Sequence, residues 1–79
     1  MLQLSFRKHL FDLRLGEQGM LQQIDLPEEE ARRLMELGFL PGSHVTAAHG
    51  APGGDPRIFQ VDGSEIALRR ETATQLKIG

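Results

Sequence analysis

Apolar side chains recur with helical spacing in the segment that begins after Leu26. Three consecutive glutamates open this segment, where the helix dipole favours negative charge, and Pro27 suits the first helical position. Gly38 follows the last apolar residue and suits a left-handed helix end. We therefore expect a helix over residues 27–37. Its inward stripe should consist of Ala31, Leu34, Met35 and Leu37.

Shorter stretches on both sides of this helix alternate apolar and polar residues with the period of a β-strand. Asp62 and Gly63 separate two of these stretches, and this residue pair is a strong signal for a two-residue hairpin turn. Residues 70–75 have room for one helical turn before the last strand. The expected strands cover residues 20–25, 45–49, 57–61, 65–68 and 76–78.

Two segments rich in turn-forming residues interrupt the strands. Residues 39–42 read as a tight type II turn, because Pro41 pre-sets the first central position and Gly42 accepts the positive φ of the second. Residues 50–56 contain three glycines and two prolines, and we expect them to form a long loop.

A chain of 79 residues can form one small domain with a limited core. Short strands would expose long edges in an open sheet, whereas closure into a barrel removes these edges. We predict a mainly β fold, namely a small SH3-like barrel of about five short strands with one α-helix and a short C-terminal helical turn. The barrel should cover residues 10–79, after an N-terminal extension of residues 1–9. Its core leaves no volume for a deep substrate cleft, so we expect no enzymatic activity.

Composition and charge narrow the class of partner. The chain is 39% hydrophobic and 25% charged, as in folded globular domains, and it contains no cysteine. The formal net charge of -2 does not favour nucleic acid, because nucleic-acid-binding modules carry a basic face. No apolar segment has the length of a signal-peptide core or of a membrane span. These features predict a soluble, cytoplasmic protein that is not inserted in the membrane and that acts by binding another molecule.

Without cysteine, histidines and carboxylates are the candidate metal ligands. His44 and His49 lie an odd number of residues apart on one expected strand, so their side chains should face opposite sides. His9 has no second histidine nearby in the sequence. We therefore expect no intrinsic cofactor and no metal site within one chain. A divalent cation, iron or zinc, is expected only at a contact between two copies, where a surface histidine combines with Asp55 or Glu65.

Four stretches of the chain carry a recognisable pattern. They are the helix end and turn at residues 34–45 (LMELGFLPGSHV), the loop at 51–56 (APGGDP), the hairpin at 61–71 (VDGSEIALRRE) and the opening turn at 13–19 (LRLGEQG). Together they resemble the FeoA family of ferrous iron transport proteins A. The resemblance covers roughly residues 10–78. Ser64 and Gly53 depart from it, because family members often carry an aromatic residue at the first position and a larger apolar residue at the second.

The resemblance implies an SH3-like barrel, a cytoplasmic location and no catalytic residues. It also implies an accessory role to FeoB, the membrane permease for ferrous iron that carries a GTPase domain. The protein would then reach the inner membrane only peripherally, through this partner. A similar barrel forms the C-terminal domain of metal-dependent repressors of the DtxR class, so a metal-responsive regulatory module or another interaction domain is the alternative. Homodimer formation is left open.

The surface for the partner is expected at the tight turn and at the long loop, since turn residues next to Pro-Gly are usually exposed. For Phe39 and Leu40 the alternative is that both side chains seal the barrel. The predicted partner-binding residues are Phe39, Leu40, Pro41, Gly42, Pro52, Gly53, Gly54 and Asp55.

Overall fold

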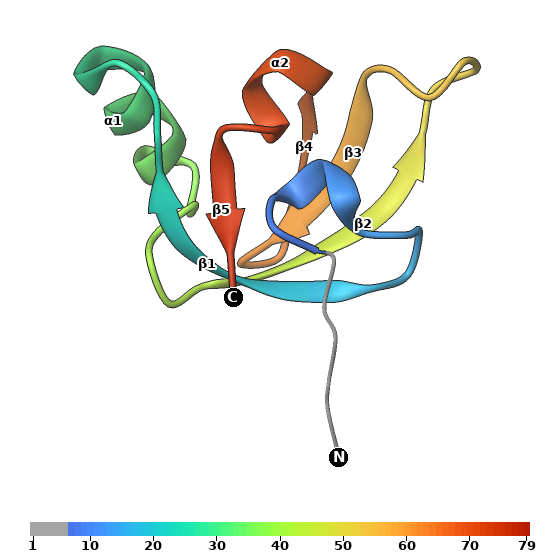
Figure 1. Ribbon diagram of the computed structural model, residues 1–79, viewed down its shortest axis with the longest axis horizontal. Coiled ribbons are helices and arrows are strands. Elements are labelled where there is room, and N and C mark those ends of the chain that lie inside the picture. Colours follow the sequence, from blue (N-terminus) through green and yellow to red (C-terminus); the bar gives the residue numbers. More distant parts are fainter. Residues whose placement is uncertain (1–6) are drawn as a thin grey trace.

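Residues 7–79 are described by the computed structural model, and Figure 1 shows how their elements are arranged. The predicted succession of strands, helix and helical turn is confirmed. A short 3-10 helix, which the sequence pattern did not indicate, precedes the first strand. In chain order the elements are η1 (Leu10–Asp12), β1 (Gln18–Ile24), α1 (Glu28–Glu36), β2 (His44–Gly50), β3 (Arg57–Val61), β4 (Ser64–Leu68), α2 (Arg70–Ala73) and β5 (Leu76–Ile78).

All five strands belong to one antiparallel sheet in the order β4-β3-β2-β1-β5. Irregular register interrupts the pairing of β1 with β5 and of β2 with β3, and such bulges increase the bend and twist of a strand. The sheet curls around its own core, as in an SH3-like barrel (Figure 1). β4 and β5 end the sheet and do not pair with each other within residues 7–79. The fold is the predicted small SH3-like barrel, but the expectation that closure removes the strand edges is wrong for the described residues, since β4 and β5 each keep a free edge.

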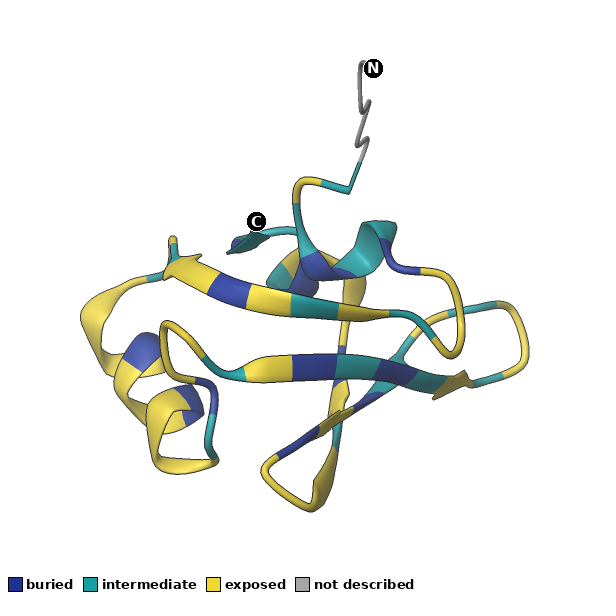
Figure 2. Cartoon of the chain, turned by 90° about the horizontal axis from the view of Figure 1, so that it is seen from below, coloured by how far each residue is buried: buried dark blue, intermediate teal, exposed yellow. Residues whose placement is uncertain are grey.

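The core lies inside the curled sheet, and every buried side chain of the described residues is apolar. β2 and β3 contribute alternate positions, as the strand period requires, and Figure 2 shows these buried residues as separate blocks along β2. The buried cluster consists of Leu10, Leu13, Leu21, Leu34, Phe39, Val45, Ala47, Phe59, Val61, Leu68, Ala73 and Leu76. Because every element contributes to it, the cluster joins the described chain into one domain.

Helix α1 is less buried than its apolar stripe predicted. Ala31 and Leu34 are buried, whereas Met35 and Leu37 are 39% and 46% exposed. The predicted inward position of Met35 and Leu37 is therefore wrong. The physical reason is that α1 packs on the barrel along one narrow line of residues three apart, and Leu37 lies beyond the last residue of the helix.

Gly38 follows this helix with a positive φ of 109°. A Cβ atom at this position would lie 3.3 Å from the Cβ of Asp62 in the turn between β3 and β4. We expect Gly38→Ala to lower the free energy of unfolding by about 1–3 kcal/mol, because it combines backbone strain with this close contact. Gly16→Ala is the control for urea unfolding, since Gly16 also has a positive φ but open space around an added Cβ. Equal losses for the two variants would contradict a role for the contact with Asp62.

The segment around η1 closes one side of the barrel. The Arg57 guanidinium donates hydrogen bonds to the carbonyl oxygens of Phe11 and Leu13, at 3.2 and 2.7 Å. It also lies 4.3 Å from the centroid of the Phe11 ring, which adds a cation–π contact. These contacts hold the start of the described chain against β3.

The division between an extension of residues 1–9 and the barrel stays a prediction, and residues 1–6 lie outside the described part.

A charged cluster fixes the turn before β1. Glu17 accepts hydrogen bonds from the Arg7 side chain, at 2.8 and 2.6 Å, and from the backbone N–H of Arg14, at 2.7 Å. The bonds from Arg7, followed by the one from Arg14, lower the pKa of Glu17 from 4.5 to about 2. Because the folded state has the lower pKa, the ionised carboxylate stabilises the fold above pH 4.5. This contribution is lost as the pH falls toward 2.

The expected result is that the stability difference between the wild type and Glu17→Gln shrinks as the pH is lowered from 4.5 to 2. Urea unfolding at a series of pH values measures this difference. In a parallel NMR titration, Arg7→Gln should raise the pKa of Glu17 toward its ordinary value. A stability difference that does not change with pH would contradict the linkage.

Candidate functional site

A hollow of about 310 Å³ opens between the end of α1, the start of β2 and the β3–β4 turn. We call it the turn hollow, and its lining residues are Gly38, Leu40, Gly42, Ser43, His44 and Asp62. The backbone N–H of Ser43 donates to the carbonyl oxygen of Leu40 at 2.8 Å, and Gly42 has a φ of 96°. The predicted Pro41-Gly42 turn is thereby confirmed.

Backbone hydrogen bonds hold this turn on β1. Gly42 N–H donates to the carbonyl oxygen of Leu21 at 2.7 Å, and Leu21 N–H donates to the carbonyl oxygen of Ser43 at 2.8 Å. Asp62, which has a φ of 53° in the tight β3–β4 turn, supplies the facing wall of the hollow. The turn hollow is therefore built on backbone that is fixed from two sides.

Large apolar side chains are exposed around the turn hollow. Leu37 and Leu40 are each 46% exposed, and Leu37 directly precedes Gly38, which lines the hollow. Met20, which is 36% exposed, pairs with His44 of the hollow across β1 and β2. We call these three residues, Met20, Leu37 and Leu40, the turn patch. Exposed apolar residues that gather around a hollow are typical of a binding surface.

Phe39 and Leu40 lie in opposite environments although they are neighbours in the sequence. Phe39 is 0% exposed and belongs to the core, so the core alternative holds for this residue. Leu40 is exposed and lines the turn hollow, and Pro41 and Gly42 are exposed beside it. Of the predicted contact residues in this turn, Phe39 can act only as a support beneath the surface.

The predicted loop contact lies far from the turn. β2 begins next to the turn hollow and ends at the loop, and a strand of its seven residues spans about 20 Å. Figure 1 shows the loop between β2 and β3 at the opposite end of the sheet from the turn before β2. Pro52 and Gly53 are exposed in this loop, while Gly54 is half-buried and donates its N–H to the carbonyl oxygen of Ala51. One small contact cannot include both predicted segments.

The Asp55 side chain, which belongs to this loop, is bonded to the start of α2. One of its carboxylate oxygens accepts a hydrogen bond from the backbone N–H of Arg70 at 3.0 Å. This bond satisfies a free donor in the first turn of α2, as side-chain caps do. The predicted roles of Asp55 in partner or metal binding stay predictions.

The side chains of His44 and His49 share the outer face of the sheet, and the prediction that they face opposite sides is wrong. The register of β2 against β3 shifts between Ala47 and His49, which adds one residue to β2. Because of the added residue, His49 pairs with Ile58, whereas Thr46 pairs with Gln60, two residues further along β3. Residues two apart on a strand point to the same face, so His49 lies on the face of Thr46 and His44.

His49 lies beside Glu65 on this outer face. Its Nε2 atom is 3.6 Å from a carboxylate oxygen of Glu65, and the other oxygen accepts a hydrogen bond from Gln60 at 3.1 Å. His9 is 3.6 Å from Asp12 near η1 and is not part of this group. Nowhere in residues 7–79 do three histidine, aspartate or glutamate side chains gather closely enough to hold a metal ion.

Sequence reasoning did not identify Met20, Leu37 and Asp62 as neighbours of the turn. The Asp62-Gly63 pair indicated a hairpin but not the place where this hairpin would meet the helix end.

Among the described residues, no helix is long and apolar enough to cross a membrane.

The described chain is a small SH3-like barrel with an apolar patch beside a turn that backbone hydrogen bonds hold on β1, and exposed apolar patches are typical of interaction surfaces. The FeoA domain family matches residues 8–78, and the chain belongs to this family. The resemblance seen in the sequence is thereby confirmed. The family is linked to ferrous iron transport and is not a known enzyme family.

Three relatives illustrate this membership. A fusion of Fe(2+) transport protein A with Fe(2+) transporter FeoB from Porphyromonas gingivalis is 28% identical over 69 residues, which are 87% of this chain but only 8% of the fusion protein. The solution structure of FeoA from Chlorobium tepidum has a TM-score of 0.84 at 27% identity, over 89% of this chain and 67% of that one. FeoA from Stenotrophomonas maltophilia, crystallised with zinc, has a TM-score of 0.77 at 33% identity, over 90% and 88% of the two chains. That protein is described as a prokaryotic SH3 domain protein with a suggested role as a ferrous iron transport activating factor.

Proposed function

We propose that this chain is a non-enzymatic accessory protein of bacterial ferrous iron uptake that docks on the cytoplasmic part of a FeoB-type permease. It works in the cytoplasm and reaches the membrane through this partner. The turn patch, together with Pro41 and Gly42, forms the docking surface. The docking regulates the transporter through its GTPase domain.

The observation that carries this proposal is the turn patch itself. Leu37 and Leu40 are large apolar side chains that remain about half exposed beside a hollow on rigid backbone. A partner that covers them gains hydrophobic free energy without having to order the turn first. The fusion of transport protein A with FeoB in the Porphyromonas gingivalis relative supports the choice of partner.

Binding of the purified chain to the immobilised cytoplasmic domain of its cognate permease tests the proposal. Biolayer interferometry is carried out without nucleotide, with GDP and with a non-hydrolysable GTP analogue. We expect saturable binding in at least one state and an affinity that depends on the nucleotide. No binding in any of the three states, with both proteins folded, would refute the docking.

A second candidate function is divalent metal binding between two copies of the chain. The carboxylate of Glu65 lies 3.6 Å from His49, so these two side chains would supply two ligands of a four-ligand zinc site, and the same two residues of a second copy would supply the other two. The zinc in the Stenotrophomonas maltophilia structure supports this candidate. Calorimetry with zinc and with ferrous iron, in parallel with light scattering, should show binding coupled to dimer formation. Binding that His49→Ala leaves unchanged would exclude this pair of residues.

A further inference from the structure

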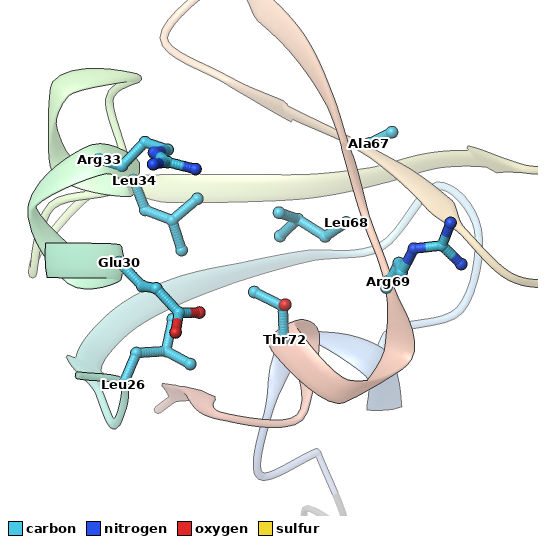
Figure 3. Close-up of a pocket in the computed structure, with 8 residues that line it drawn as sticks. All are labelled: Leu26, Glu30, Arg33, Leu34, Ala67, Leu68, Arg69 and Thr72. Atoms are coloured by element: carbon cyan, nitrogen blue, oxygen red, sulfur yellow. The ribbon is translucent and has the colours of Figure 1, made fainter.

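A second, groove-shaped pocket lies on the open side of the barrel, away from the turn hollow. It has a volume of about 230 Å³ and separates α1 from the end of β4 and from α2. Figure 3 shows the side chains of Leu26, Leu34 and Leu68 directed toward its centre. Leu34 and Leu68 are buried, so the floor of the groove is continuous with the core. We call this pocket the α1–β4 groove.

The free edge of β4 borders this groove. β4 pairs only with β3, and the two-residue turn at Asp62 and Gly63 makes Val61 and Ser64 the first hydrogen-bonded pair. In an antiparallel ladder the hydrogen-bonded pairs alternate, so Ile66 and Leu68 also bond to β3. The N–H and C=O groups of the residues between them, Glu65 and Ala67, therefore point away from the sheet.

Ala67 connects this free edge to the groove. It is a lining residue, yet Figure 3 shows its methyl group directed away from the centre of the pocket. Its backbone is thus the part that faces the groove. No residue of the described chain donates to the Ala67 carbonyl or accepts from its N–H outside the β3–β4 ladder.

Polar side chains without partners surround the apolar floor. Glu30, Arg33 and Arg69 line the groove, and none of their side chains forms a hydrogen bond or ion pair with another described residue. Thr72 of α2 lines the groove beside them (Figure 3). Two cations against one carboxylate favour an occupant that brings a negative charge.

We propose that the α1–β4 groove binds an extended peptide segment, which adds to β4 as a further strand. The peptide backbone pairs with the free N–H and C=O groups of Ala67 and Glu65. One apolar side chain of the peptide packs on Leu34 and Leu68, and an aspartate or glutamate side chain pairs with Arg33. This site lies apart from the turn patch and does not depend on the proposed function.

The dimensions of the groove favour this occupant over a small molecule. Sites for drug-sized ligands have volumes of about 300–1,000 Å³ and enclose most of the ligand, whereas this groove is smaller and open along a strand edge. A bound helix would leave the free backbone groups of β4 without partners, because its own backbone groups are already bonded to each other. An extended chain satisfies these backbone groups and places alternate side chains toward the floor.

Selection from a phage-displayed library of random peptides tests the proposal, with the full chain as bait. We expect enriched peptides that alternate apolar residues and carry an aspartate or glutamate. Ala67→Pro removes the edge N–H and should abolish binding, since proline is tolerated on an edge strand. Ala67→Val keeps the N–H and should retain binding. Arg33→Glu should weaken binding by about tenfold or more, whereas Arg32→Glu, on the same helix but outside the groove, should not.

Further measurements make each outcome decisive. If circular dichroism shows that Ala67→Pro is unfolded, the enriched peptide with N-methylated backbone amides replaces it and should bind at least about tenfold more weakly. No enrichment, or enriched peptides that bind Ala67→Pro as well as the wild type, would overturn the proposal. A dimer that Ala67→Pro dissociates would overturn it in favour of a second copy as the occupant. Leu40→Asp should leave peptide binding unchanged, which separates this site from the turn patch.

Discussion

Leu40→Asp is expected to weaken binding to the cytoplasmic domain of the permease by at least about 30-fold, because a central apolar contact contributes 2 kcal/mol or more to an interface. The new carboxylate would also have to be buried without a partner next to Asp62, which increases the loss. Leu40 is about half exposed on a turn, so its replacement should change the free energy of unfolding by no more than about 0.5 kcal/mol. Biolayer interferometry and urea unfolding of the same preparation measure the two effects.

Leu15→Asp is the matched control for this variant. Leu15 is 57% exposed, lies in the turn before β1 and does not line the turn hollow. The Leu15→Asp variant introduces the same change of charge at a comparable exposed leucine, so its affinity for the cytoplasmic domain of the permease should stay within about twofold of that of the wild type. If both variants lose binding equally, net charge rather than the turn patch controls the association. If Leu40→Asp binds normally, the docking surface is misplaced.

Phe39→Ala is expected to lower the free energy of unfolding by about 3–5 kcal/mol. The Phe39 side chain is fully buried and is one of the largest in the core, so its removal leaves a cavity that a rigid barrel cannot close. A domain of this size has a total stability of only about 4–12 kcal/mol, so this loss should remove a large share of it and lower the midpoint of thermal unfolding markedly. Thermal and urea unfolding followed by circular dichroism measure the loss.

Leu40→Ala is the control for Phe39→Ala because the two residues are adjacent and both lose a large apolar side chain. Its cost should stay below about 1 kcal/mol, since a half-exposed side chain leaves no closed cavity. A loss of less than about 1 kcal/mol for Phe39→Ala would contradict the assignment of this residue to the core. Comparison of the two variants therefore distinguishes a residue that supports the turn from within the core from a residue that lies on its surface.

The elements of this fold were predictable where the signal is local. The helix start at the three glutamates, the Pro41-Gly42 turn and the Asp62-Gly63 hairpin all depend on residues close in sequence. The bulge in β2 carried no such signal, because it results from how the bent strand fits β3. One added residue there placed His44 and His49 on the same face, against the simple strand period.

The candidate site was predicted in part. The turn at Leu40 was identified from the Leu-Pro-Gly order, whereas for both Phe39 and Leu40 the choice between core and surface was left open. Asp62 joins the site from the β3–β4 turn and Met20 from β1, and their positions depend on sheet register, which a single sequence does not reveal. The α1–β4 groove was missed for the same reason, since it exists only where the sheet remains unclosed.

Turn residues and strand period were enough to predict a small barrel, and four motifs in order were enough to recognise the resemblance to the FeoA family, because each of these signals comes from residues close in sequence. Which side of each element faces water was visible only in the folded barrel. Burial of Phe39, exposure of Met35 and Leu37, and the distance between turn and loop all follow from how a curled sheet packs on itself. The turn patch was therefore predicted at Leu40 but acquired its extent only from the folded barrel.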